Sequence, residues 1–128
     1  SSRDDSTVDG NGASRVNPNL KPEVLAPGAG IISTAPGTTY YRSSGTSGAT
    51  VFIAGTLALI LEEFPNMSRS GGSHNSDCIV AMKQALMDSI DPEIAEVEHD
   101  GALGYGNLDA VAWFEVVETQ QASNPCIV

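Results

Sequence analysis

The most regular pattern in the chain is an apolar run near its middle. The run follows small and hydroxyl-bearing residues, and it ends at Glu62, Glu63, Phe64 and Pro65. Its apolar members are Val51, Phe52, Ile53, Leu57, Leu59, Ile60 and Leu61. Glycine and small residues before such a run, and acidic residues and proline after it, are typical of a loop that leads into a helix. We therefore predict a mostly buried helix of about four turns over residues 47–63.

Shorter patterns flank this helix. Apolar segments bounded by proline and glycine predict strands or extended pieces over 22–26 and 29–34, and β-branched and aromatic residues predict a further strand over 38–41. Asp77 is a candidate N-cap for a helix over 78–89. The one-sided apolar stripe of that helix consists of Ile79, Met82, Ala85, Leu86 and Ile90.

A last amphipathic helix is expected over 108–118, through Val111, Trp113, Phe114 and Val117. The other segments have loop composition: 1–20 is a surface loop rich in Ser, Asp, Asn and Gly, 66–77 is polar, 91–103 is acidic, and 119–128 is a polar tail. No internal repeat is visible. With 128 residues, the chain has the length of one domain at most.

Composition and charge narrow the functional classes. An apolar content of 41% allows a packed core. A net charge of −10 argues against nucleic acid and against anionic membrane surfaces as partners. The apolar run over 51–61 is too short to span a bilayer, and the first residues lack the basic and apolar regions of a signal peptide. We therefore expect no nucleic acid and no membrane among the partners.

Cys78 and Cys126 are the only cysteines. A disulfide between them would tie the tail to the helix near residue 78, and two unpaired buried thiols are the alternative, since pairing cannot be deduced from sequence. Two distant cysteines are too few for a metal site. The segment 5–12 has a passing likeness to a calcium loop, but Val16 stands where a bidentate Glu is needed. We expect a solvated loop there and no metal.

The candidate chemistry lies where the apolar run begins, in Gly45-Thr46-Ser47-Gly48-Ala49. Ser47 is predicted at a helix N-terminus, where free backbone N–H groups and the helix dipole favour negative charge. A nucleophilic serine benefits from that place, because its attack on a carbonyl creates an oxyanion. The glycines leave room for a substrate backbone. The alternative is an ordinary cap, since serine and threonine are favoured at helix starts.

Several stretches together resemble the C-terminal third of a subtilisin-like serine protease. Lys21-Pro22-Glu23-Val24-Leu25-Ala26-Pro27-Gly28, followed by Ile31-Ile32-Ser33-Thr34, is similar to the family's Lys-Pro-Asp-Val-Val-Ala-Pro-Gly stretch. The family's serine motif, Gly-Thr-Ser-x-Ala-x-Pro-x-Val-x-Gly, is matched at Gly45, Thr46, Ser47, Ala49 and Gly55, with Ile53 for Val. Ser1-Ser2-Arg3 resembles the family's Ser-Ser-Arg-Gly, and Gly104-Tyr105-Gly106-Asn107-Leu108-Asp109-Ala110 resembles the turn that opens its last helix. The resemblance covers residues 1–117 in order and spacing.

This resemblance implies an α/β fold, as part of a three-layer α/β/α domain with a mostly parallel sheet. It implies a secreted serine endopeptidase that cleaves protein or peptide substrates through an acyl-enzyme on Ser47. The Ser47 backbone N–H would donate to the oxyanion, Thr46 would line the oxyanion side, and the backbone of Ser44 and Gly45 would line the cleft together with Gly48. Family members often bind structural calcium, but no convincing site for calcium or any other cofactor is visible in this chain.

The rest of the catalytic machinery is missing from the sequence. Triads in this family run Asp, His, Ser along the chain, whereas His74 and His99 both follow Ser47. The Asp, the His and the oxyanion-binding Asn would therefore lie in an upstream segment or a second chain. We expect both histidines to be surface residues, and this chain alone to be inactive.

Two other interpretations stay open. Gly48, Val51 and Phe52 stand where the family usually has Met, Pro and frequently His, and Asp4 replaces a Gly, which fits a catalytically inactive binding or structural module. The serine motif also nearly fits the Gly-x-Ser-x-Gly elbow of α/β-hydrolases, in which Asp91 and His99 would follow in the right order for an esterase.

Overall fold

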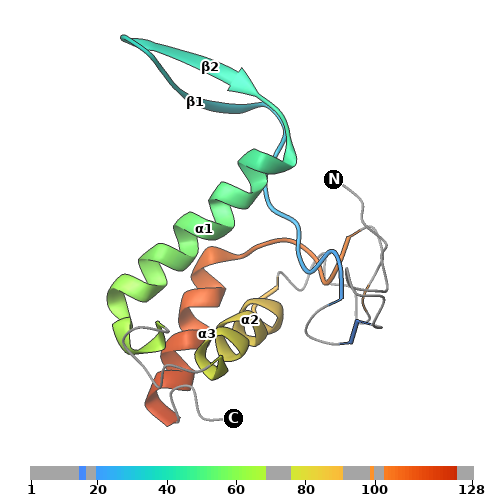
Figure 1. The fold of residues 1–128 in the computed structure, drawn as a ribbon, viewed down its shortest axis with the longest axis vertical. Helices are drawn as coiled ribbons and strands as arrows, with labels where there is room; N and C mark the ends of the chain where they lie inside the picture. The colour runs from blue at the N-terminus through green and yellow to red at the C-terminus, as the bar shows by residue number, and fades with distance from the viewer. Residues whose placement is uncertain (1–14, 17–19, 69–75, 91–98, 100–102, 124–128) are drawn as a thin grey trace.

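The structure is a computed structural model that describes residues 15–16, 20–68, 76–90, 99 and 103–123 (Figure 1). Along the chain the elements are β1 (Ile31–Ala35), β2 (Thr39–Ser43), α1 (Thr46–Glu63), a 3₁₀ turn η1 (Pro65–Met67), α2 (Asp77–Asp88) and α3 (Ala110–Ser123). The calcium-like loop, Asp4, His74, Asp91 and Cys126 lie outside the described residues. The three helices lie where the apolar patterns predict them.

The core lies where the three helices and η1 meet. Its buried members are Ile60, Met67, Met82, Ala85, Leu86, Trp113 and Val117. Trp113 donates its indole N–H to the carbonyl of Met82 at 3.2 Å, so the polar atom of this buried ring has a partner. The rings of Phe64 and Phe114 meet at 5.3 Å between centroids and join the end of α1 to α3. The core is therefore a helical one.

The helix boundaries differ in detail from the sequence prediction. Ile79 is 52% exposed, so it does not belong to the buried stripe of α2, whereas Met82, Ala85 and Leu86 do. The last helix begins at Ala110, and Asp109 accepts the Ala112 N–H at 2.9 Å through its side chain, which is the contact of an N-cap. It continues to Ser123, so residues 119–123 of the predicted polar tail are helical.

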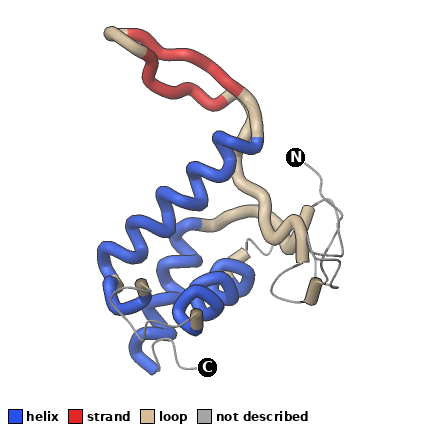
Figure 2. Tube along the Cα trace, viewed as in Figure 1, coloured by secondary structure: helices blue, strands red, loops and turns tan. Residues whose placement is uncertain are grey.

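The described sheet is a hairpin that projects away from the helices (Figure 2). β1 and β2 are antiparallel, with Ile31 opposite Ser43 and Ala35 opposite Thr39. The segment 22–26, predicted as a strand, forms only one parallel bridge, between Leu25 and Asn107. The α/β class is correct, but the mostly parallel sheet is not seen among the described residues, because no further strand lies beside this segment there.

The prediction that α1 is mostly buried is wrong for this chain. Of its residues only Ile60 is fully buried, while Val51 and Leu59 are 67% and 66% exposed. One face of α1 packs on the core through Ile53, Leu57 and Leu61, and the opposite face has no cover in the described part of the chain. α1 is also the one described helix that is long and apolar enough to cross a membrane by length and composition, a test that core helices of soluble proteins pass as well.

Candidate active site around Ser47

The segment 22–28 is the base on which the serine loop rests. Its backbone is bound to the 103–108 turn: Leu25 N–H donates to Gly106 O, Tyr105 N–H to Glu23 O and Leu108 N–H to Leu25 O, each at 2.8 Å. Gly104 has a φ of +63°, and a Cβ there would lie 2.4 Å from Glu23 O. Only glycine at position 104 allows this approach. The stretch 21–28 and the turn 104–110, far apart in the sequence, therefore lie in direct backbone contact.

The serine loop is attached to this base by two hydrogen bonds. Gly45 N–H donates to Gly28 O at 2.7 Å, and Gly30 N–H donates to the Ser44 hydroxyl at 2.8 Å. A Cβ on Gly28 would lie 2.9 Å from Gly45 O and 3.2 Å from the Cβ of Ala49. The glycine at position 28 therefore lets the loop and the first turn of α1 lie directly on the base.

Ser47 is the second residue of α1 and its side chain is exposed. The N-cap of α1 is Gly45, and no side chain caps this helix, so the alternative in which Ser47 is an ordinary cap is wrong. The first-turn N–H groups have no acceptor within the helix, and the first turn itself carries no acidic residue that would neutralise the positive end of the dipole. The position suits a group that becomes negatively charged.

Ser47 opens onto a hollow of about 610 Å³ between the hairpin and α1. The hollow is lined by Ile31, Ile32, Ser33, Tyr41, Ser43, Ser47, Gly48, Val51, Phe52, Gly55 and Thr56. These lining residues include no histidine, aspartate or glutamate that could accept the Ser47 proton. Among the described residues, the hollow thus combines the Ser47 hydroxyl with a helix N-terminus, without a side chain that could act as a general base.

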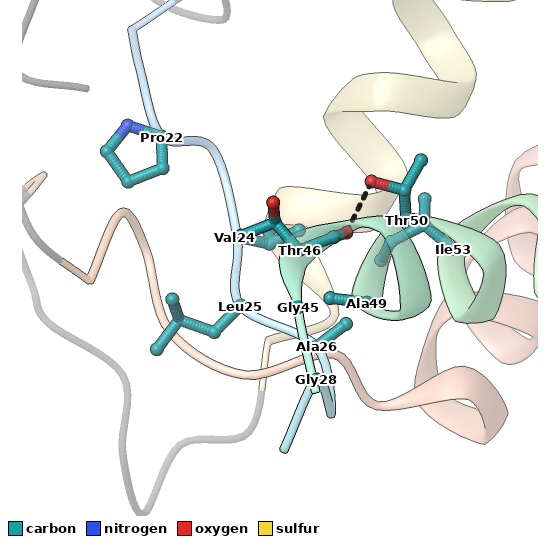
Figure 3. A pocket seen from close by; sticks show the side chains of 10 residues that line it. All are labelled: Pro22, Val24, Leu25, Ala26, Gly28, Gly45, Thr46, Ala49, Thr50 and Ile53. Atoms are coloured by element: carbon teal, nitrogen blue, oxygen red, sulfur yellow. Dashed lines mark hydrogen bonds between the residues drawn. The ribbon is translucent and has the colours of Figure 1, made fainter. Parts of the chain in front are cut away.

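Thr46 and Gly45 line a second cavity, of about 430 Å³, on the side of the helix start that faces the base (Figure 3). Its other lining residues are Pro22, Val24, Leu25, Ala26, Gly28, Ala49, Thr50 and Ile53. The Thr50 hydroxyl donates to Thr46 O at 2.9 Å across the first turn. Of the site residues expected from sequence, Ser47 and Gly48 therefore line the first hollow, and Thr46 and Gly45 line the second cavity. Ser44 lines neither of them and binds Gly30 through its hydroxyl.

His99 does not belong to the serine site. Its Nε2 lies 2.8 Å from the carbonyl of Pro22, to which it donates, and its ring meets Tyr105 edge to face at 5.3 Å. The side chain is half-buried, so the expectation of a surface residue is wrong. Its partners place it against the base under the serine loop, which is a structural role and gives no support to the α/β-hydrolase interpretation.

The ion pairs of Glu23 were not foreseen from the sequence, whereas a disulfide at Cys78 was one of two alternatives left open. Glu23 binds both Lys21 and Lys83, the latter at 2.7 Å, and so joins the base to α2. Cys78 is buried and disulfide-bonded, while its pairing with Cys126 stays a prediction because Cys126 lies outside the described residues. The described residues contain no group of three His, Cys, Asp or Glu side chains that could hold a metal ion. No local pattern signals the contact of Glu23 with Lys83, since these two residues come together only in the fold.

Comparison with known proteins shows that this chain is similar to subtilases. The model of the subtilase family matches residues 5–106. Subtilisin DY of Bacillus licheniformis and subtilisin E of Bacillus subtilis (strain 168) are each 48% identical over 48 residues, which are 38% of this chain but 18% and 13% of those proteins. An intracellular serine protease of Paenibacillus polymyxa is 52% identical over 44 residues, 34% of this chain and 14% of that protein.

Two solved structures share the fold. The CspB protease of Clostridium perfringens superposes with a TM-score of 0.61 and 28% identity over 82% of this chain and 22% of that one. The prenylagaramide maturation protease PagA superposes with a TM-score of 0.53 and 25% identity over 88% of this chain and 39% of that one. In each comparison the chain spans well under half the length of its relative. With the family model matching most of its length, this chain belongs to the subtilase family.

Proposed function

We propose that this chain is the serine-bearing part of a subtilase endopeptidase. The observation that supports this most directly is the position of Ser47, which is exposed at the uncapped N-terminus of α1 and opens onto a hollow. Ser47 Oγ attacks the scissile carbonyl carbon and gives its proton to a histidine. The C–N bond then breaks, the amine leaves with that proton, and water hydrolyses the resulting ester. The Ser47 N–H stabilises the oxyanion.

The histidine, its orienting aspartate and the oxyanion-binding asparagine come, in this proposal, from an upstream segment of the same protein or from a second chain. Two observations support a missing part: no described residue lining the Ser47 hollow could act as a general base, and the same hollow exposes Val51 and Phe52. A large apolar face of this kind is typical of a surface that another part of the protein covers. The disulfide at Cys78 fits the expected extracellular location, because disulfides persist in oxidising compartments.

The second candidate function is a catalytically inactive subtilase-like module that binds or stabilises. It is favoured by Gly48, Val51 and Phe52, three departures from the family's serine motif. None of them removes an atom of the nucleophile. The two functions differ in one property, which is whether the Ser47 hydroxyl is activated.

The test is covalent labelling of the complete protein with a serine-directed phosphonate, followed by mass spectrometry of the Ser47 peptide. We expect one adduct at Ser47, none in Ser47→Ala, and none in isolated residues 1–128, which should also fail to hydrolyse peptides. An unlabelled Ser47 in the folded complete protein would establish the inactive module instead. Turnover by the isolated chain that Ser47→Ala abolishes would contradict the missing-part proposal.

A further inference from the structure

We propose that the Ser44 hydroxyl is a positioning group for the Ser47 nucleophile, an inference that rests on the function proposed above. Ser44 does not reach the hollow in which Ser47 lies. Its hydroxyl instead accepts the Gly30 N–H at 2.8 Å. This contact holds the backbone immediately before α1, and through it the angle at which Ser47 meets a substrate.

The hydrogen bond between Gly30 N–H and the Ser44 hydroxyl lies where the backbone hydrogen bonding of the hairpin stops. The β1–β2 ladder ends at the pair Ile31–Ser43, and Gly30 and Ser44 would form the next pair. At that point the Gly30 N–H meets a side-chain oxygen of Ser44 in place of a backbone carbonyl. The hydroxyl thus lets the chain leave the ladder for the helix while the Gly30 N–H keeps a partner.

The neighbouring residue makes this restraint necessary. Gly45 lies between Ser44 and the first residue of α1, and glycine has more backbone freedom than any other residue. Two contacts restrain the loop here, the Gly45 N–H donation to Gly28 O at 2.7 Å and the Ser44 hydroxyl. Only the second depends on a side chain, so it alone can be removed by substitution without changing the backbone.

Misplacement of a nucleophile slows the chemical step more than it weakens binding. Without the Ser44 hydroxyl, Ser47 should spend less time in the attacking geometry, while the contacts that bind substrate stay in place. The expected signature is therefore a lower kcat with an unchanged KM.

The experiment compares Ser44→Ala, Ser44→Thr and Thr39→Val in the complete protein, with kcat and KM for a peptide substrate and the rate of phosphonate labelling at Ser47. Thr39 is the matched control: its hydroxyl donates to Pro36 O at 3.1 Å on the same hairpin, at the end away from α1. Ser44→Ala should lower kcat and the labelling rate about three- to tenfold, the factor that corresponds to one net hydrogen bond. KM should stay within about twofold, Ser44→Thr should restore kcat, and Thr39→Val should leave it unchanged.

The outcomes separate this inference from the proposed function. If Ser47 of the unsubstituted protein is labelled and Ser44→Ala keeps the kcat of that protein, the positioning role is wrong, while the proposed peptidase function is supported. An equal loss in Thr39→Val, or no recovery in Ser44→Thr, would also overturn the positioning role, because the effect would then not depend on this hydroxyl. If Ser47 of the unsubstituted protein is not labelled at all, the proposed function itself fails.

Discussion

Glu23 Oε1 lies 2.7 Å from Lys83 Nζ, and this ion pair joins the base of the serine loop to α2. Lys21 contacts the same carboxylate oxygen. Burial by itself raises the pKa of Glu23, but the hydrogen bonds and charges of Lys21 and Lys83 outweigh it and hold the pKa below its ordinary value. Glu23 is therefore ionised in the folded protein at neutral pH, and its charge contributes to stability.

The first prediction concerns pH. A carboxyl whose pKa is lower in the folded state stabilises the protein above its unfolded pKa, about 4.3, and the contribution is lost as pH falls through the folded pKa. In the complete protein with Ser47→Ala to prevent self-cleavage, Glu23→Gln should lower the free energy of unfolding by about 1 kcal/mol at pH 7. In urea unfolding the deficit should shrink below about pH 4.

Glu118→Gln is the control for this prediction, because it removes the same charge from an exposed position on α3. It should leave the urea midpoint of unfolding unchanged at pH 7 and at pH 3. A Glu23→Gln deficit that is equally large at pH 3 and pH 7 would show that the effect is not carried by the ionised carboxylate.

The second prediction compares two glycines with left-handed backbone, in order to separate the stability cost of a steric collision from that of backbone strain. Gly104 and Gly37 have φ of +63° and +79°, but a Cβ on Gly104 would lie 2.4 Å from Glu23 O, whereas one on Gly37 would meet nothing within 4 Å. Gly37→Ala should cost about 1 kcal/mol of stability from strain. Gly104→Ala should lower the stability by about 3 kcal/mol or more, because the added methyl group also collides with Glu23 O and separates the 103–108 turn from segment 22–28. Equal costs in urea unfolding would mean that the close approach is not important.

The third prediction concerns the uncovered face of α1. Isolated residues 1–128 should bind an apolar dye and melt without a sharp transition, since Val51 and Phe52 are 67% and 41% exposed. Phe52→Ser should reduce dye binding by the isolated chain, yet lower the stability of the complete protein by about 3 kcal/mol, because the proposed upstream part would cover this ring there. Val111 on α3 is 68% exposed but does not line the Ser47 hollow, so Val111→Ser should leave the stability of the complete protein unchanged. A complete protein that tolerates Phe52→Ser would show that nothing covers this face.

The helices and the position of Ser47 at a helix start were predictable from sequence because their signals are local. The apolar stripe of α2 places Met82, Ala85 and Leu86 in the core, and the serine motif places Ser47 at a helix start. The burial of α1 could not be predicted, because the run from Val51 to Leu61 specifies a helix but not what packs on each face. The contacts of Ser44 with Gly30 and of Glu23 with Lys83 were equally out of reach, since each joins residues that only the fold brings together.

The last prediction concerns Gly48, beside Ser47. The family usually has Met there, and oxidation makes a thioether polar and bulkier. A Cβ on Gly48 would meet nothing within 4 Å, so Gly48→Met should fold and be active. After hydrogen peroxide treatment Gly48→Met should lose activity about tenfold or more, because the sulfoxide displaces substrate beside Ser47. The unsubstituted protein and Gly48→Ala should keep most of theirs, since Met67 and Met82 are buried and Met87, half-buried on α2, does not line the Ser47 hollow. An unsubstituted protein that loses activity as fast as Gly48→Met would place the sensitive group elsewhere than position 48.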